Sequence, residues 1–196
     1  MSVDAVLALG SNQGESRRIL AEAVGRLGEH PRVSVTARSP VVITAPVGGP
    51  ADQPDFLNMV VGVRTDLRPF ALLRWCQEIE HRFHRVRTVR WGPRTLDVDI
   101  ISYGGLHMDE PELVLPHPRA GQRAFVLAPW ARMDPDAQLD GIRVAALAER
   151  APDADGVRGW LTEALRHGES LGIGSGAGPV HHFHEQWRWQ HPETIH

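Results

Sequence analysis

Two aspartates that lie two residues apart are the feature of this sequence best suited to catalysis. Asp97 and Asp99 belong to a run of hydrophobic residues, 95–101, that is typical of a strand, and strand side chains at i and i+2 share one face. Two carboxylates on one face repel each other unless a cation lies between them, and oxygen ligands suit Mg²⁺. The pair predicts a phosphoryl-transfer site in which two ions clamp the reacting oxygens. The alternative is a solvated strand face that carries two acids.

A cluster of arginines precedes the two aspartates. Five lie within thirteen residues, at Arg82, Arg85, Arg87, Arg90 and Arg94. Guanidinium groups bind phosphate oxygens in a bidentate manner, so the cluster places anion-binding groups beside the candidate metal site. Taken alone, the arginines also fit a solvated helix end or a weak RNA-binding patch.

The absence of lysine narrows the possible phosphate chemistry. All 21 basic residues of the 196 are arginines. A P-loop, a protein-kinase site and a Schiff-base enzyme each require a lysine, so all three are excluded. Phosphate must therefore be bound by arginines, metal ions or backbone N–H groups.

The bulk composition indicates an ordinary globular protein. Hydrophobic residues make up 42% and charged residues 23%, and the net charge is −3, which argues against a general nucleic-acid or membrane-surface binder. The single cysteine, Cys76, excludes an internal disulfide and suits a reducing cytoplasm. The N-terminus shows no signal-peptide pattern, and the apolar runs are too short to span a bilayer. We expect a cytoplasmic monomer with no nucleic-acid or membrane partner.

Two further groups of residues could recognise a flat heterocycle and its phosphates. His117 is held rigidly between two prolines and is followed by Arg119 and Arg123. Asn58 could read the edge of a heterocycle, and the rings of Phe56 and Phe125 could cover its two faces. The simpler alternatives are a loop histidine without function and two core phenylalanines.

Hydrophobic periodicity predicts the order β-α-β-β-α-β, followed by further helices. This order is typical of an α+β sandwich of ferredoxin-like type, with helices on one face of a mainly antiparallel sheet. In the second helix, core spacing links Phe70, Leu73, Cys76, Ile79 and Phe83. The expected strands are 3–9, 33–37, 41–44, 56–63, 95–102 and 113–115, and the expected helices are 15–27, 69–83, 125–131 and 142–149.

The composition changes after residue 150. Residues 172–178 are almost entirely glycine, alanine and serine, and a histidine- and tryptophan-rich segment follows them. We expect one domain at 1–150 and a flexible C-terminal extension of unknown function at 151–196.

Several short motifs, in order over roughly residues 3 to 140, resemble the 6-hydroxymethyl-7,8-dihydropterin pyrophosphokinases of folate biosynthesis. The most specific runs from Arg90 to Ile100 and reads RWGPRTLDVDI. The others are LGSN at 9–12, TAPVG at 44–48, QPDFLN at 53–58, QEIE at 77–80, RVR at 85–87, LPHP at 115–118 and RAFVL at 123–127.

The resemblance implies transfer of a pyrophosphoryl group from ATP to the pterin hydroxymethyl oxygen, with release of AMP. It implies two Mg²⁺ ions on Asp97 and Asp99, together with catalytic roles for Arg85, Arg94 and Arg123. It also assigns the pterin to Gly10, Thr44, Val47, Phe56, Asn58 and Phe125. The residues that it assigns to ATP are Gln77, Glu80, Arg87, Trp91, Ile100 and His117.

The sequence departs from the family at a few positions. Ala45 and Phe56 stand where relatives often have Pro and Tyr, and Phe56 keeps the ring while it loses the hydroxyl. His84 replaces a glycine, and a loop lysine common in relatives is missing, so its phosphate contact would pass to Arg87 or Arg90. Asp97 is one candidate proton acceptor, and no other general base stands out.

Two functions of other classes remain open from the residues alone. One is a two-metal nuclease or nucleotidyltransferase, and the other is a non-enzymatic RNA-binding module that uses the arginine cluster. The second would bind RNA with a steep salt dependence and without magnesium. Neither gives a role to Phe56, Asn58 or His117.

Overall fold

A computed structural model of the protein describes residues 1–48, 50, 52–83 and 93–161. Its centre is an antiparallel six-stranded sheet in the order β10-β3-β4-β1-β5, with β2 paired to β4 beside β3. The predicted α+β class with a mainly antiparallel sheet is confirmed. The strands are β1 (Val3–Ser11), β2 (Val33–Arg38), β3 (Val41–Thr44), β4 (Phe56–Thr65), β5 (Asp97–Tyr103) and β10 (Val157–Leu161).

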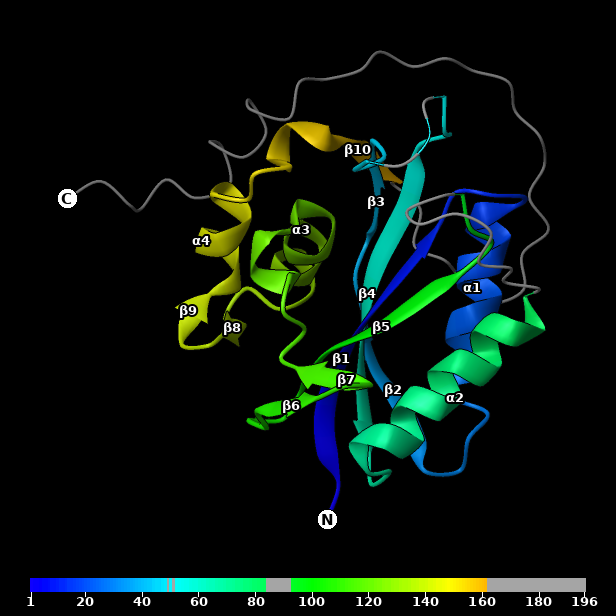
Figure 1. Ribbon diagram of the computed structural model, residues 1–196, viewed down its shortest axis with the longest axis vertical. Coiled ribbons are helices and arrows are strands. Elements are labelled where there is room, and N and C mark those ends of the chain that lie inside the picture. Colours follow the sequence, from blue (N-terminus) through cyan, green and yellow to red (C-terminus); the bar gives the residue numbers. More distant parts are fainter. Residues whose placement is uncertain (49, 51, 84–92, 162–196) are drawn as a thin grey trace.

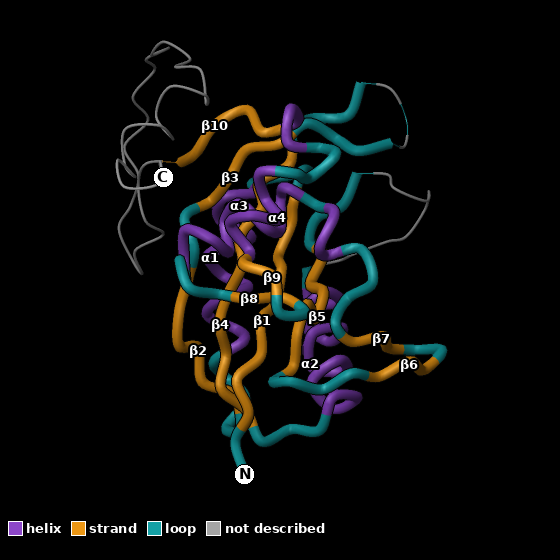
Figure 2. The backbone as a smooth tube through the Cα atoms, turned by 90° about the vertical axis from the view of Figure 1, so that its left-hand side faces the viewer, coloured by secondary structure: helices purple, strands orange, loops and turns teal. Residues whose placement is uncertain are grey.

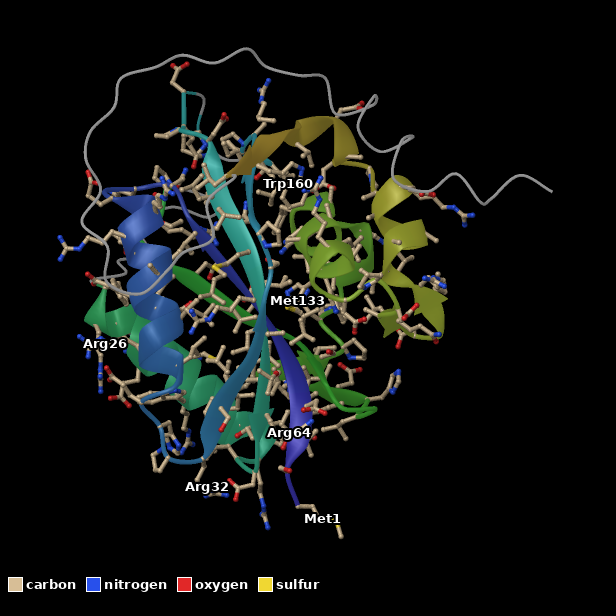
Figure 3. All side chains as sticks on the ribbon, turned by 180° about the vertical axis from the view of Figure 1, so that it is seen from behind. Met1, Arg26, Arg32, Arg64, Met133 and Trp160 are labelled. Carbon is tan, nitrogen blue, oxygen red and sulfur yellow. The ribbon has the colours of Figure 1, made fainter. Side chains whose placement is uncertain are left out.

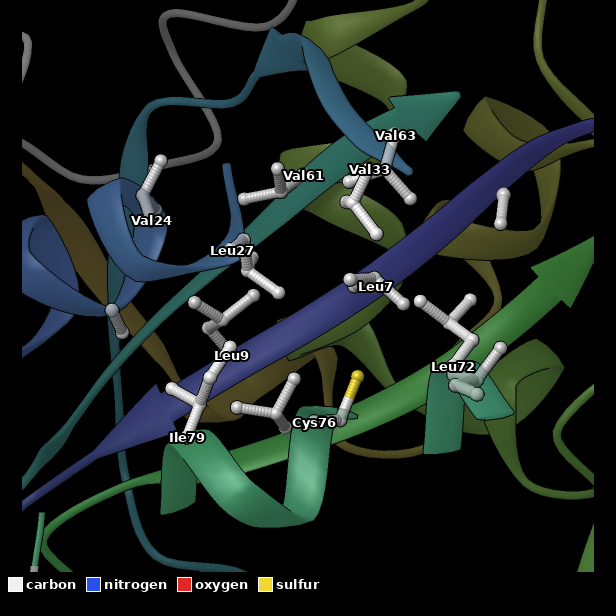
Figure 4. Packing of buried hydrophobic residues seen from close by; sticks show 14 of the residues in the cluster. Leu7, Leu9, Val24, Leu27, Val33, Val61, Val63, Leu72, Cys76 and Ile79 are labelled. Carbon is white, nitrogen blue, oxygen red and sulfur yellow. The ribbon is translucent and has the colours of Figure 1, made fainter. Parts of the chain in front are cut away.

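Helices cover both faces of the sheet (Figure 1). On one face, α1 (Ser16–Leu27) and α2 (Pro69–Arg82) pack over a core that includes Leu7, Leu9 and Ile79, shown in Figure 4. On the other face, α3 (Ala124–Met133) and α4 (Val144–Glu149) pack over a second core.

The prediction of helices on a single face is therefore wrong. The central strands carry apolar side chains on both faces, as strands do when both sides of a sheet are buried. Leu7 and Leu9 of β1 face the first core, whereas Val6 and Ala8 pack against the second. The second face needs its own cover, and α3 and α4 supply it.

Short elements connect the main ones. They are β6 (Met108–Glu110) with β7 (Leu113–Leu115), β8 (Gln138–Leu139) with β9 (Ile142–Arg143), and the 3₁₀ turns η1 (Ala120–Gln122) and η2 (Ala154–Gly156). The helix expected at 142–149 begins only at Val144, because Ile142 and Arg143 pair with β8.

The buried face of α2 differs slightly from the predicted one. Leu72, Cys76, Ile79 and Glu80 are buried, whereas Phe70 is exposed. Leu72 takes the inward position instead, four residues before Cys76.

The sheet continues past residue 150. Strand β10 pairs with β3, and the two lie side by side in Figure 2. At least the first part of the predicted extension therefore belongs to the sheet, and residues 162–196 lie outside the described residues.

The two ends of the sheet differ in character. Figure 3 shows Arg32 and Arg64 at the end where β1 begins and Trp160 at the opposite end. At the first end, Arg64 is paired with Asp4 and Arg32 with Asp66. At the second end, β1 finishes at Gly10 and Ser11 among the residues that the sequence assigns to a site.

Candidate functional site

Gly10 lies at the centre of the candidate site. In the sheet register it is opposite Asn58 of β4 on one side and Asp97 of β5 on the other. These residues share the face covered farther along by α3, because Ala8 and Val60, two residues away on their strands, pack in the second core. One sheet face thus brings together the predicted pterin-reading amide and the first aspartate.

The Asn58 side chain is fixed by its neighbours. It is buried and donates a hydrogen bond of 2.8 Å from Nδ2 to Thr44 Oγ1, and Thr44 is also buried. A Cβ on Gly10 would lie 2.6 Å from Asn58 Oδ1, so only a glycine fits there without a shift. The bond to Thr44 uses one amide proton, and the amide has a second proton and a carbonyl oxygen to offer a ligand.

The two aspartates lie on the same face, as their spacing predicts. Asp97 and Asp99 are half-buried, whereas the alternate residues Val98 and Ile100 point into the first core. Arg94, three residues before Asp97, donates a hydrogen bond to its carboxylate. The start of β5 therefore presents two acids and one guanidinium to the site.

Each predicted stacking ring has a guanidinium over it. The Cζ atom of Arg94 lies 5.7 Å from the centre of the Phe56 ring, and that of Arg123 lies 5.2 Å from the centre of the Phe125 ring. Both distances are typical of a cation–π contact. Neither ring is fully buried, and Phe125 also packs against the second core.

His117 is held in one tautomer beside the acids. Its backbone N–H donates to Ile101 O at 2.8 Å, and its Nδ1 accepts a hydrogen bond of 3.2 Å from the Arg119 N–H. An accepting Nδ1 leaves the proton of the neutral ring on Nε2. Burial and the charges of Arg123 and Arg119 lower the pKa of His117, although Asp97 opposes the shift. The ring is therefore neutral at pH 7.

Arg123 keeps its charge despite its partial burial. Burial lowers the pKa of its guanidinium, and Asp99, Asp97 and Asp153 act in the opposite direction. Arginine remains protonated in proteins because its ordinary pKa is above 12. The site thus has two fixed cations, Arg94 and Arg123, near two acids.

A second group of predicted residues lies at the outer edge of β5. Buried Glu80 accepts a hydrogen bond of 2.8 Å at Oε1 from the Val98 N–H. Gln77, almost one turn earlier on α2, is exposed. The Ile100 side chain is buried in the first core, so only its backbone can contact a ligand. In an antiparallel strand, the N–H and C=O groups of alternate residues point to the same side. The backbone groups of Ile100 therefore face the outer edge of the sheet, as those of Val98 do.

Asn12 is a site residue that the sequence prediction missed. Its Nδ2 donates to Pro54 O at 3.1 Å, and its Oδ1 accepts from the Arg94 N–H at 2.9 Å. Its own N–H donates to Arg94 O at 3.1 Å. One buried amide thus joins the end of β1 to two loop ends that are far apart in sequence. The LGSN motif contains Asn12, but only the fold shows what it contacts.

Some predicted residues cannot be placed in this site. Arg85, Arg87 and Trp91 lie outside the described residues. Val47 is described, and its side chain is 59% exposed on the loop after β3. Within the described ranges, no group of three or more His, Cys, Asp or Glu side chains is arranged to hold a metal ion.

Comparison with known proteins agrees with the motifs. The model of the 7,8-dihydro-6-hydroxymethylpterin-pyrophosphokinase family matches residues 6–135. The 2-amino-4-hydroxy-6-hydroxymethyldihydropteridine pyrophosphokinase of Bacillus subtilis is 44% identical over 156 residues, covering 80% of this chain and 89% of the relative. The enzyme of the same name from Pseudomonas aeruginosa is 44% identical over 147 residues, covering 74% and 90%.

Solved structures show the same fold. Wild-type HPPK-DHPS of Plasmodium falciparum matches with a TM-score of 0.57 at 14% identity, covering 76% of this chain and 45% of that one. At this identity the likeness concerns the fold alone, and it confirms the ferredoxin-like sandwich. The family match and the bacterial relatives carry the further conclusion: the chain belongs to the 7,8-dihydro-6-hydroxymethylpterin-pyrophosphokinase family.

Proposed function

We propose that the residues around Gly10 transfer the pyrophosphoryl group of ATP to the hydroxymethyl oxygen of 6-hydroxymethyl-7,8-dihydropterin, with release of AMP. As a family member, the chain is an ATP-dependent diphosphotransferase of folate biosynthesis. The observation that carries the assignment to this site is the register of Gly10. It places the fixed amide of Asn58 one strand away from Gly10 on one side and the carboxylate of Asp97 one strand away on the other.

The pterin ring would lie at the Asn58 side. Asn58, oriented by Thr44, would read the hydrogen-bonding edge of the heterocycle, and the missing side chain of Gly10 would leave the amide undisturbed. Phe56 and Phe125 would stack on the ring, since a planar heterocycle packs well between aromatic faces. Val47 would contact the ring from its loop.

ATP would lie along the outer edge of β5 and reach the phosphate-binding cations. The backbone of Ile100, with Glu80 and Gln77, would contact the nucleoside part. The neutral His117 would donate from Nε2 to a phosphate oxygen, and this role is favoured by the bond that occupies its Nδ1. Arg94 and Arg123 would neutralise the phosphates, together with Arg85 and Arg87 from outside the described residues. Trp91, which also lies outside them, would contact ATP.

The donor set suits magnesium. Asp97 and Asp99 offer carboxylate oxygens on one face and leave further coordination positions for water and phosphate oxygens, the arrangement that Mg²⁺ prefers. Two Mg²⁺ ions held there would supply neutralisation of the phosphate charge and a lower pKa for the attacking hydroxyl.

The chain itself would contribute mainly positioning and charge. The hydroxymethyl oxygen forms a bond to the β-phosphorus as the bond from that phosphorus to the α,β-bridging oxygen breaks, and AMP leaves with that oxygen. The proton of the hydroxyl would pass to an acceptor, for which Asp97 is one candidate. Arg94 and Arg123 hold the charge that develops on the transferred group, as phosphoryl-transfer enzymes generally do.

The product nucleotide distinguishes this reaction from an ordinary kinase reaction. The full chain, incubated with ATP, Mg²⁺ and 6-hydroxymethyl-7,8-dihydropterin, should release AMP only when the pterin is present. Chromatography of AMP and ADP would show the outcome. Release of ADP, or AMP without pterin dependence, would contradict the proposal.

Replacement of either acid tests the metal assignment. Asp97→Ala and Asp99→Ala should each lower kcat by more than about 100-fold, the loss typical of one charge-stabilising contact in a transition state. Circular dichroism should show that both variants remain folded. Asp109→Ala removes an exposed acid on β6 and serves as the control with unchanged kcat. An Asp97 or Asp99 variant with near-normal turnover would exclude that residue as a ligand.

We also propose that the chain acts as a cytoplasmic monomer. No described helix is long and apolar enough to cross a membrane. Light scattering of the purified chain tests the monomer directly.

A further inference from the structure

The carboxylate of Asp153, which lies outside the matched residues 6–135, fixes the start of α3 beside the candidate site. Asp153 Oδ1 accepts a hydrogen bond of 2.7 Å from the Ala124 N–H. Ala124 is the first residue of α3 and is buried, and its N–H is one of the donors that a helix leaves without a partner in its first turn. Asp153 supplies that partner from 29 residues farther along the chain.

The residue that Asp153 fixes lies between two functional side chains. Arg123 precedes Ala124 and Phe125 follows it, so the orientation of this peptide sets where the guanidinium and the ring point. Arg123 itself caps no donor of α3 with its side chain. The charge of Asp153 also helps Arg123 remain protonated despite its burial.

The segment that follows Asp153 also contacts the backbone around Thr44. Three residues after Asp153, the carbonyl oxygen of Gly156 accepts a hydrogen bond of 2.8 Å from the Ala45 N–H. Val157, which opens β10, is opposite Thr44 in the sheet register. Residues 153–157 therefore contact the backbone beside Phe125 and the backbone beside Thr44, two residues assigned to the pterin.

We propose that Asp153 is a positioning residue for the pterin: it orients Arg123 and Phe125 and, through the segment 153–157, fixes them relative to Thr44. This inference rests on the proposed function. Asp153 acts through Ala124 and does not itself contact the substrate.

Kinetics with both substrates test this role. Asp153→Ala should raise the KM for the pterin about tenfold, the effect expected from losing one hydrogen bond to a charged group. The KM for ATP should rise by no more than about twofold, because Arg94 also binds the phosphates. Asp153→Asn keeps an acceptor oxygen and should restore the pterin KM to within about threefold of the wild type. Asp155→Ala, an exposed acid in the same turn, is the matched control and should change neither KM.

Hydrogen exchange supplies a readout that does not depend on turnover. The Ala124 amide should exchange faster in Asp153→Ala than in the wild type and at near-normal rate in Asp153→Asn. Should the alanine variant not fold, Asp153→Glu keeps the charge but displaces the acceptor, and it should still raise the pterin KM at least about threefold.

The outcomes separate this inference from the proposed function. A wild-type chain without pterin-dependent AMP release would overturn the function and this role with it. With an active wild type, an unchanged ratio of the two KM values in the folded alanine or glutamate variant would overturn the role of Asp153 alone. Unchanged exchange at Ala124 would do the same.

Discussion

At the scale of single residues, the site depends on one position where no side chain fits. Gly10 lies between the strand that carries Asn58 and the strand that carries Asp97. The Asn58 amide occupies the space that a Cβ would need, and this amide is in turn bonded to Thr44. The smallest possible addition at Gly10 would therefore disturb the group proposed to read the pterin.

Substitution of Gly10 by alanine should mainly affect pterin binding. The new Cβ would lie 2.6 Å from Asn58 Oδ1, so the amide must move and its bond to Thr44 weakens. We expect the KM for the pterin to rise at least about tenfold, which corresponds to one hydrogen bond lost from a site that needs it.

The control is Gly105→Ala, because no atom lies within 4 Å of a Cβ built there. Steady-state kinetics with varied pterin would measure the effect. A Gly10→Ala enzyme with a normal pterin KM would show that Asn58 does not read the pterin.

His117 should titrate below the ordinary histidine range. Burial, then the charges of Arg123 and Arg119, disfavour the protonated ring and lower its pKa from 6.5. NMR titration of the ring protons would locate the midpoint. A midpoint at or above 6.5 would show that the ring is not held neutral among these cations.

The same shift has a consequence for stability. Between the folded-state pKa and 6.5 the unfolded chain binds more protons than the folded one, so this contribution to stability is present above 6.5 and is lost as the pH falls through the folded-state pKa. His117→Asn should therefore show a smaller fall in Tm between pH 7.5 and 5.5 than the wild type. Thermal unfolding at the two pH values would measure it.

At the scale of elements, Asn12 connects loops that no sequence pattern links. Pro54 ends the loop before β4, and Arg94 ends the loop before β5. Both loops carry residues assigned to substrates, so the amide of Asn12 fixes one point of each loop relative to the end of β1.

Replacement of Asn12 by aspartate should break the bond to Pro54 and keep the bond to Arg94. The carboxylate retains an acceptor for the Arg94 N–H but has no donor for Pro54 O. We expect a loss of roughly 0.5–1.5 kcal/mol in the free energy of unfolding for Asn12→Asp, the net contribution of one hydrogen bond, because Pro54 is exposed and water can replace the lost donor. Denaturant titration would measure this.

The matched variant is Asn12→Ala, which removes both side-chain bonds. Hydrogen exchange at the Arg94 amide should stay slow in Asn12→Asp and become fast in Asn12→Ala. Equal exchange in the two variants would contradict the assignment of the Asn12 oxygen to the Arg94 N–H and of the Asn12 nitrogen to Pro54 O.

Local patterns predicted the elements better than the contacts between them. The alternation around Asp97 and Asp99 indicated both the strand and the shared face, because strand geometry depends only on neighbouring residues. The cover on the second sheet face was not foreseen, although Val6 and Ala8 already indicated apolar side chains on both faces of β1.

Long-range contacts of the site could not be predicted in this way. The bond from Val98 to Glu80 and that from Ala124 to Asp153 join residues 18 and 29 positions apart, and no period in the sequence links them. Phe70 shows the converse: its spacing fits the core, but it is exposed because the buried face of α2 begins at Leu72 and continues at Cys76.

At the scale of the whole molecule, the sheet continues past residue 150, where the composition changes. β10 extends the sheet beyond β3, and Ala151 is buried in the second core. Trp160 holds the strand to α3, since the Arg132 guanidinium carbon lies 3.8 Å from the centre of a Trp160 ring. We propose that the domain ends near residue 161.

Two truncations distinguish the boundaries. A chain that ends at Leu161 keeps every described contact and should unfold within about 2 °C of the full chain, since surface changes away from such contacts cost little. A chain that ends at Arg150 loses β10 and the bonds to Ala45 and Ala124, and it should unfold at a clearly lower temperature. Equal Tm values for the two truncated chains would place the boundary at 150.

The outer edge of β5 has a consequence for the behaviour of the protein at high concentration. An edge strand normally presents a row of N–H and C=O groups that can recruit a strand from another molecule, which leads to edge-to-edge aggregation. Here the Glu80 carboxylate occupies the Val98 N–H, and the backbone of His117 occupies the Ile101 carbonyl. Among the described residues of this edge, a neighbouring strand would meet open backbone groups mainly around Ile100, a stretch too short for stable pairing. We therefore expect little edge-to-edge aggregation through β5.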